Sequence, residues 1–324
     1  MKNHRAPVLL AAVALLWTAR IPFGAEGYPS STVKILVPQA PGGLVDTLPR
    51  ILGQKITEAT KQPVVIENRI GGNGAVAGAE VARSAPDGYT LLMSFHALNV
   101  MLPHMTSKLT FDPNKDLAPI AYVMSVPNIL VVHPSIPANS VEDLMAYGKS
   151  NPGKLTFASQ GVGSTGHVAG ELFNQLTGIE AVHVPYRGAA PAAQALIGGQ
   201  VTMMFDVMSL ASEPVKAGKL RALGVAAANR VRAMSNVPTL SEVGLPLEIS
   251  AWFGLMAPAG TPPAIIAWLN RETNRVFSMP EISARYISEG ASFPLGTPET
   301  FGTHIAAEHQ KWGPVIRKVG IRID

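Results

Sequence analysis

Two glycine-rich loops carry the clearest chemistry in this chain, because each joins a strand pattern to a helix pattern. Residues 33–51, VKILVPQAPGGLVDTLPRI, run from β-branched residues through Pro41, Gly42 and Gly43 to apolar residues at helical spacing. Residues 154–176, KLTFASQGVGSTGHVAGELFNQL, repeat that order. Glycine lets a ligand approach the backbone, and the first turn of a helix presents unpaired N–H groups that attract anions. We therefore expect the loops to face each other across a cleft and hold one small carboxylate or phosphate.

Two polar residues beside these loops have open roles. Asp46 either caps the first helix, or fixes the loop or accepts a hydrogen bond from a ligand amine, hydroxyl or water. His167 lies in the first turn of the second expected helix, where the helix dipole disfavours its charged form. It is either a neutral histidine that faces the ligand or caps the helix, or a packed histidine bonded to the backbone. His167 and His183 do not predict a metal site, because the chain lacks cysteine and an H-E-x-x-H motif.

Two more strand ends are expected at the cleft, since ligands of open α/β sheets sit beyond the carboxyl ends of strands. The strand expected over 89–93 leads into Ser94, Phe95 and His96, at the same edge as the first glycine loop. Phe95 is expected to form a wall of the cleft. The strand expected over 201–205 delivers Asp206, whose role is as open as that of Asp46.

Residues 161–166, GVGSTG, also match the dinucleotide fingerprint G-x-G-x-x-G after a strand. The fingerprint wants an acidic residue at the end of the next strand, but that strand ends in Pro185, Tyr186 and Arg187. Arg187 would suit a 2′-phosphate, so a secreted NADP-type oxidoreductase is the alternative reading. No G-x-S-x-G motif and no thiol are present, and only 15% of residues are charged. The sequence therefore gives no indication of another catalytic activity.

The N-terminal residues 1–27 have the pattern of a secretory signal peptide. Lys2 and Arg5 precede the apolar run 7–19, which is shorter than the ~20 residues of a membrane span. Cleavage is expected between Gly27 and Tyr28. About half of the net charge of +4 lies in this segment, so the mature chain has no basic excess that would indicate a nucleic-acid partner. With no cysteine, no disulfide or N-terminal lipid is expected, and the predicted location is the periplasm, in soluble form.

The alternation of strand and helix patterns in the remaining chain predicts parallel sheets with covered faces, and its length fits about two domains of ~150 residues each. We expect a discontinuous first lobe over 28–133 and 248–324 and an inserted second lobe over 134–247. Strand patterns over 120–132, interrupted by Pro127, and over 249–257 would cross between the lobes and form a hinge.

Eight blocks of the sequence resemble the Bug (TctC-type) family, the periplasmic solute-binding proteins of tripartite tricarboxylate transporters. They are YPSSTVKILVPQAPGG, VVIENRIGGNGAVAG, PDGYTLL, GKLTFASQGVGSTGHVAGELF, VHVPYRGAAPA, GKLRALGVA, VPTLSEVG and PAGTPP. The resemblance implies a two-lobed venus-flytrap fold of class α/β, with two mixed sheets flanked by helices and two hinge strands. It further implies a monomer without catalysis or cofactor, which captures a small carboxylate (a mono-, di- or tricarboxylate or an aromatic acid) and delivers it to the membrane subunits of the transporter.

The same resemblance implies a set of ligand-binding residues. The first-lobe grip is Gly42, Gly43 and Asp46, and the second-lobe grip is Ser159, Gly163, Ser164 and Thr165. Residues 94–96 and Asp206 line the remaining wall. Two positions depart from the family pattern: Gln39 stands where an aromatic residue is common, and Pro49 stands where alanine is usual. Proline is tolerated in the first turn of a helix, which predicts a helix that begins near Asp46.

Overall fold

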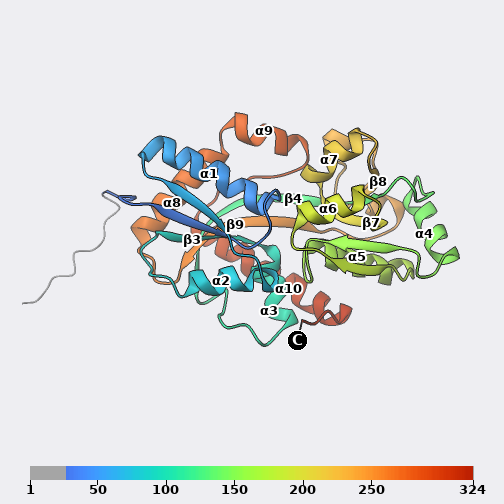
Figure 1. Cartoon of the computed structure of the whole chain (residues 1–324), viewed down its shortest axis with the longest axis horizontal. Coiled ribbons are helices and arrows are strands. Elements are labelled where there is room, and N and C mark those ends of the chain that lie inside the picture. Colours follow the sequence, from blue (N-terminus) through green and yellow to red (C-terminus); the bar gives the residue numbers. More distant parts are fainter. Residues whose placement is uncertain (1–26, 324) are drawn as a thin grey trace, which may run out of the picture.

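The computed structural model describes residues 27 to 323. The predicted signal peptide, apart from Gly27, lies outside these residues. Within them, no helix combines the length and apolar character that crossing a membrane requires. The chain forms a two-lobed α/β fold of the periplasmic-binding-protein type, with the strands running through the middle and helices on both sides (Figure 1).

The first lobe contains four strands that run in one direction and one strand between them that runs the opposite way. Its strands, in the spatial order β2-β1-β3-β9-β4, are β2 (Val64–Asn68), β1 (Val33–Val37), β3 (Thr90–Phe95), β9 (Ser250–Pro258) and the first part of β4 (Leu117–Val132). Its helices are α1 (Leu44–Thr60), η1 (Gly72–Gly74), α2 (Ala75–Ala82), η2 (Ala97–Met101), α3 (Leu102–Met105), α8 (Pro263–Phe277), α9 (Pro280–Ser288) and α10 (Pro298–Val319). In Figure 1, α1 and α9 lie above the strands and α2, α3 and α10 below them.

The second lobe is built around the end of β4 and four later strands. The strands are β5 (Thr156–Ser159), β6 (Val182–Pro185), β7 (Met203–Val207) and β8 (Arg221–Val225). The helices are α4 (Val141–Ser150), α5 (Thr165–Thr177), α6 (Ala189–Ile197), α7 (Met208–Lys216), η3 (Arg232–Met234) and η4 (Ser241–Val243). β6, β5 and β7 run in this order, and β7 and β8 both pair with β4.

The long strand β4 connects the lobes by changing partners along its length. Residues 117–127 pair with β9, and residues 128–132 pair with β7 and β8. The expected interruption at Pro127 is wrong, because the strand continues through it. Pro127 has no N–H to offer a sheet ladder, and it is the last residue paired with β9, where the ladder ends anyway.

The second crossing lies at the start of β9, beside the first. Asn128 N–H donates to the carbonyl of Ile249 at 3.1 Å, and Ile249 N–H donates to the carbonyl of Ala226 at 3.1 Å. Ser250, the next residue, already pairs with Pro127 in the first lobe. Because the chain crosses between the lobes at these two places, we propose the predicted division. The first lobe covers 28–133 and 248–324, and the second lobe, 134–247, is inserted into it.

One expected helix start is wrong by two residues. α1 begins at Leu44 rather than near Asp46, because Gly43 is extended and its carbonyl accepts the N–H groups of Asp46 and Thr47. Pro49 therefore lies in the second turn and removes one intrahelical hydrogen bond. In the second lobe, α4 is capped by Ser140, whose Oγ accepts the N–H of Asp143.

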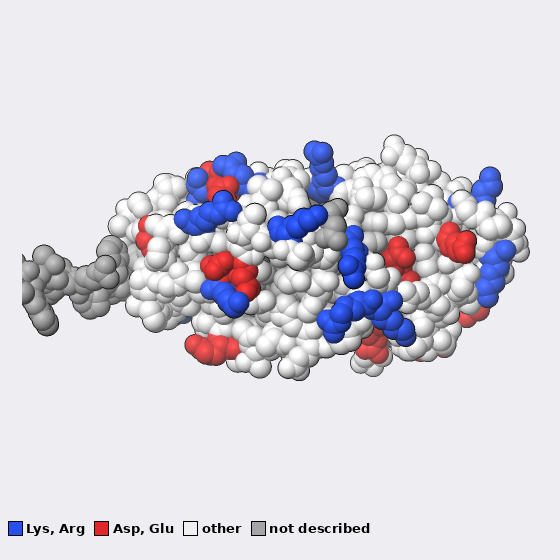
Figure 2. All heavy atoms as spheres, turned by 90° about the horizontal axis from the view of Figure 1, so that it is seen from below, with Lys and Arg blue, Asp and Glu red and all other residues white. Residues whose placement is uncertain are grey.

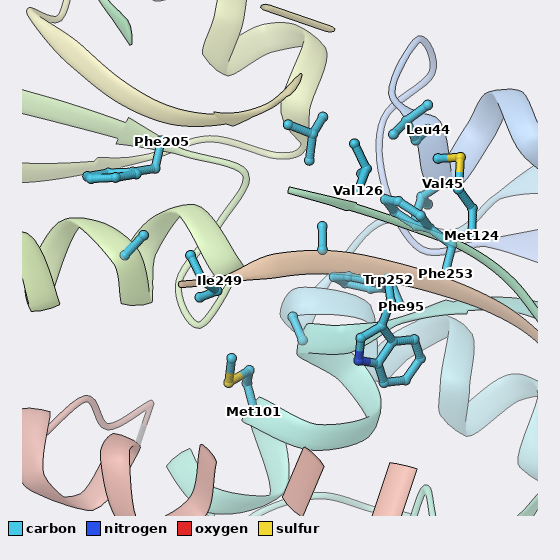
Figure 3. Close-up of a cluster of buried hydrophobic side chains, with 14 of the residues drawn as sticks. Leu44, Val45, Phe95, Met101, Met124, Val126, Phe205, Ile249, Trp252 and Phe253 are labelled. Carbon is cyan, nitrogen blue, oxygen red and sulfur yellow. The ribbon is translucent and has the colours of Figure 1, made fainter. Parts of the chain in front are cut away.

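The molecular surface carries charges of both signs. Figure 2 shows basic and acidic side chains interspersed among wide uncharged areas on the face seen from below. The buried apolar side chains form a cluster that runs through both lobes. Around the crossing strands this cluster includes Leu44, Val45, Phe95, Trp252 and Phe253 (Figure 3), which are also the residues that border the candidate site.

Candidate ligand-binding site

A small cavity lies between the lobes where several helices begin. It is bordered by the first residues of α1 (Leu44, Val45), by Ala97 at the start of η2, by the N-cap and first residue of α5 (Ser164, Thr165), and by Ala189 at the start of α6. The N–H groups in the first turn of a helix have no intrahelical partner. The cavity, called the inner cavity below, is therefore bordered from both lobes by residues that begin helices.

The inner cavity is small. Its volume is about 30 Å³, room for about one or two water molecules. Gln39 and Gln160 border it and also border an outer chamber of about 500 Å³, which Asn73, Tyr186 and Arg187 line as well. A ligand of several carbon atoms therefore enters the inner cavity only when the lobes or the side chains between the two spaces move.

The lobes touch each other around these spaces, and glycines make the contact possible. Ala40 N–H in the first lobe donates to the carbonyl of Arg187 in the second at 3.1 Å. A Cβ on Gly42 would lie 3.2 Å from Cβ of Ala190, and one on Gly163 would lie 2.6 Å from the sulfur of Met105. The space that a side chain would fill at Gly163 is thus occupied by the opposite lobe.

The first glycine loop is held by Asp46. This buried carboxylate accepts the Gly42 N–H at 3.1 Å, the Arg50 guanidinium at 2.7 and 3.0 Å, and the Asn68 amide at 3.0 Å. Burial favours a raised pKa for Asp46, but these hydrogen bonds outweigh it and hold the pKa below its usual value. Asp46 fixes the loop, and the Gly42 N–H is no longer available to an anion. Pro41 and Gly42 lie exposed at the loop tip.

The second glycine loop is held by neutral groups. Gly163 N–H donates to His167 Nδ1 at 2.9 Å, and Ser164 Oγ caps α5 by accepting His167 N–H at 3.3 Å. The His167 ring stacks on His183, with centroids 3.8 Å apart. His167 is thus a packed histidine bonded to the backbone. Ser159 Oγ is 2.7 Å from His183 Nε2 and also bonds within the loop. Ser164 and Thr165 border the cavity, whereas Ser159, Gly163 and His167 do not.

The wall expected from residues 94–96 is only partly formed by them. Phe95 and His96 border the inner cavity, but Ser94 lies inside β3, where its Oγ bonds to the side chain of Asn99. His96 Nε2 is 3.0 Å from Glu308 Oε2, and its ring stacks on Trp252. Burial lowers the pKa of His96, and the carboxylate of Glu308 acts in the opposite direction.

Asp206 lies one residue short of the cavity. It sits inside β7 rather than beyond its end, its Oδ1 accepts the Val207 N–H at 2.8 Å, and Val207 borders the cavity in its place. Burial raises the pKa of Asp206 to about 7. Among residues 27–323, no three or more His, Cys, Asp or Glu side chains are grouped as a metal site would need.

Sequence reasoning missed three kinds of cavity residue. Gln160 lies inside the second glycine loop, where the glycine pattern itself does not distinguish it as a cavity residue. The strand pattern over 249–257 predicts a crossing strand, but it does not indicate that Trp252 and Phe253 border a cavity. Ala189 follows a third turn, Tyr186-Arg187-Gly188, that begins a helix just as the two recognised loops do; this repeated strand–glycine–helix pattern was a signal that could have found it.

The comparison with known families identifies one family for most of the chain. The model of the tripartite tricarboxylate transporter family receptor (TctC) matches residues 48–321. BugT of Bordetella pertussis is 36% identical over 321 residues, which covers 97% of this chain and 98% of BugT. A protein encoded in the tcbD-tcbE intergenic region of Pseudomonas sp. strain P51 is 33% identical and covers 90% of this chain and 87% of its own length.

Solved structures of similar proteins agree with the fold over nearly its whole length. Rpa4515 of R. palustris, solved with adipate, has a TM-score of 0.87 and 33% identity over 91% of this chain and 99% of that one. MatC of Rhodopseudomonas palustris, solved with bound malate, has a TM-score of 0.84 and 33% identity over 89% of this chain and 100% of that one. The expected resemblance and fold class are confirmed.

Proposed function

This chain belongs to the tripartite tricarboxylate transporter receptor family, and we propose that it is a soluble periplasmic solute-binding protein. It captures a small carboxylate in the inner cavity and delivers it, as a monomer, to the membrane subunits of a transporter. The signal peptide is cleaved between Gly27 and Tyr28. The chain acts by binding alone, without catalysis or a cofactor.

One observation carries the proposal: helices of both lobes begin at the same cavity. Leu44 and Val45 of α1 and Ser164 and Thr165 of α5 border it from opposite lobes. Charge-assisted hydrogen bonds from N–H groups to a carboxylate contribute about 1.5–3 kcal/mol each. The proposed grip is therefore the first turns of α1 and α5, which include the predicted Ser164 and Thr165 and directly follow the predicted Gly43 and Gly163.

Binding is coupled to closure of the lobes. A ligand shifts a conformational equilibrium only by its difference in affinity for the two forms. An anion that bridges α1 and α5 contacts both lobes only in the closed form, so it stabilises closure. The two crossings, near Pro127 and Ile249, lie side by side and provide the hinge. Related proteins solved with adipate and with malate support a carboxylate as the ligand.

The oxidoreductase alternative has no support from the geometry. Asn73 and Met105 of the first lobe cover Gly163, and the strand after the GVGSTG loop ends in Pro185 without an acidic residue.

Titration calorimetry with carboxylates and their neutral amides tests the proposed function. We expect heat-releasing binding of at least one acid, with its amide at least ~10-fold weaker, because a neutral group loses the charge assistance of the N–H groups. Binding of an amide as tightly as its acid would contradict the proposal. Small-angle scattering of the same samples should show a more compact protein with the acid present.

A further inference from the structure

The inner cavity has apolar walls, and its polar groups gather at one side. Phe95 and Phe253, which are paired between β3 and β9, form one wall, and Leu44 and Val45 continue it along the start of α1 (Figure 3). Val207 adds an apolar surface from the second lobe. The polar groups are the two amides, Gln39 and Gln160, the ring of His96, and the start of α5.

The inner cavity offers no side-chain cation to a second negative charge. None of the described residues that border it is lysine or arginine, and Nε2 of His96 already lies 3.0 Å from the carboxylate of Glu308. Arg187 is exposed and lines the outer chamber instead. A second carboxylate placed against Phe95 and Phe253 would lose its water without gaining a partner, which costs several kcal/mol.

A buried side chain also points to an occupant at the polar side. Gln160 is 8% exposed, and its Oε1 has no hydrogen-bond partner. This oxygen lies against the first turn of α5, since a Cβ on Gly166 would be 2.6 Å from it. An unpaired buried acceptor costs about 1–3 kcal/mol, so an occupant that brings a donor is favoured here. A carboxylate has no donor of its own, so a water molecule bound beside it would have to supply this hydrogen bond.

We infer that the ligand is a monocarboxylate with an apolar body, such as a straight-chain, branched or aromatic acid, and that dicarboxylates of equal length are disfavoured. This inference rests on the proposed function and narrows it. The single carboxylate meets the first turns of α1 and α5, and the body lies along Phe95 and Phe253. Closure around an apolar body then removes water from both surfaces.

The sharpest test compares acids that differ only at the far end. Hexanoate and adipate have the same length, and so do 4-methylbenzoate and terephthalate, with a methyl group in place of the second carboxylate. On the full mature chain we expect calorimetry to give at least ~10-fold tighter binding of each monocarboxylate. Equal or tighter binding of adipate and terephthalate would overturn the inference and leave the proposed function standing. Failure of every acid, or equal binding of hexanoate and hexanamide, would instead contradict the proposed function.

The Arg187→Gln variant tests whether a ligand reaches from the inner cavity into the outer chamber. Its side chain lines the outer chamber, so the change should leave the ratio of hexanoate to adipate affinity unchanged. A selective loss of adipate binding in this variant would show that a second carboxylate reaches the outer chamber, which overturns the inference. Thermal unfolding of Arg187→Gln without ligand verifies that the variant is folded.

Discussion

The two glycine loops are alike in sequence but are held in different ways. The first is fixed by a charged network, in which Asp46 joins the Gly42 N–H to Arg50 and Asn68. The second is fixed by neutral groups, in which His167 accepts the Gly163 N–H and stacks on His183. In both loops a side chain four residues after a glycine takes the N–H of that glycine. The amides left for a ligand are those of the following helix turn.

The two loops also differ in how strictly each requires glycine. A side chain at Gly163 would meet Met105 of the opposite lobe at 2.6 Å, whereas one at Gly43 would lie 3.6 Å from Cβ of Ala189, an ordinary contact. The backbone at Gly163 has φ +81°, but Gly43 has φ −85°, which any residue adopts. Glycine is required at Gly163 for the approach of the lobes, and much less so at Gly43.

The largest expected effect on ligand affinity is that of Gly163→Ala. The new Cβ would hold α3 away from the second loop, so the closed form is destabilised and ligand affinity should fall ~100-fold, or about 2.7 kcal/mol. Gly43→Ala should change affinity less than ~5-fold. Titration calorimetry measures both, with the tightest ligand found for the wild-type protein.

The matched control for Gly163→Ala is Gly218→Ala. Gly218 also has a positive φ, 69°, but no atom lies within 4 Å of its would-be Cβ. Gly218→Ala should therefore lower the free energy of unfolding by about 1 kcal/mol, which is the cost of a left-handed backbone alone. Its ligand affinity should be unchanged. Equal affinity losses in Gly43→Ala and Gly163→Ala would remove the distinction between the two loops.

The sequence predicted the helices and strands well where the hydrophobic pattern agreed with the positions of glycine and proline. The β-branched residues at the start of 33–51 formed β1, and the apolar residues at helical spacing after them formed part of α1, because β-branched runs and helical apolar spacing are local signals. Pro127 misled the prediction, since its effect on a strand depends on whether a neighbouring strand needs its N–H. That need is set by the partners, which come from distant parts of the chain.

The cavity was predicted less well than the fold, for a related reason. A glycine pattern indicates where a helix begins, but it does not say which N–H groups are already taken. Asn68, 22 residues after Asp46, helps to hold that carboxylate in the first loop, and His183 packs on His167 from the next strand. Such contacts depend on tertiary structure, so sequence alone left the roles of Asp46 and His167 open.

The second loop should be the more sensitive one at mildly acidic pH. Burial, with the neighbouring His167, lowers the pKa of His183 from 6.5 to about 3. Between these values the unfolded chain binds more protons than the folded one, so stability falls as the pH drops from 6.5 toward 3. His183→Gln removes this dependence. After allowance for partial exposure, we expect the loss between pH 7 and pH 4.5 to shrink by about 1–2 kcal/mol, as measured by urea unfolding. Parallel pH profiles of wild type and variant would contradict this account of the loop.

The first loop should respond only at lower pH, and by less. The pKa of Asp46 is held below its usual 3.8 by the bonds from Arg50, Asn68 and Gly42, which outweigh its burial. The stability this gives is present above the unfolded pKa and is lost as the pH falls through the folded pKa. Asp46→Asn should therefore cost about 1 kcal/mol at pH 7, and this difference from the wild type should shrink as the pH falls below 3.8. A variant deficit that does not shrink on acidification would mean that the first loop is held by shape rather than by charge, and the contrast with the second loop would no longer be electrostatic.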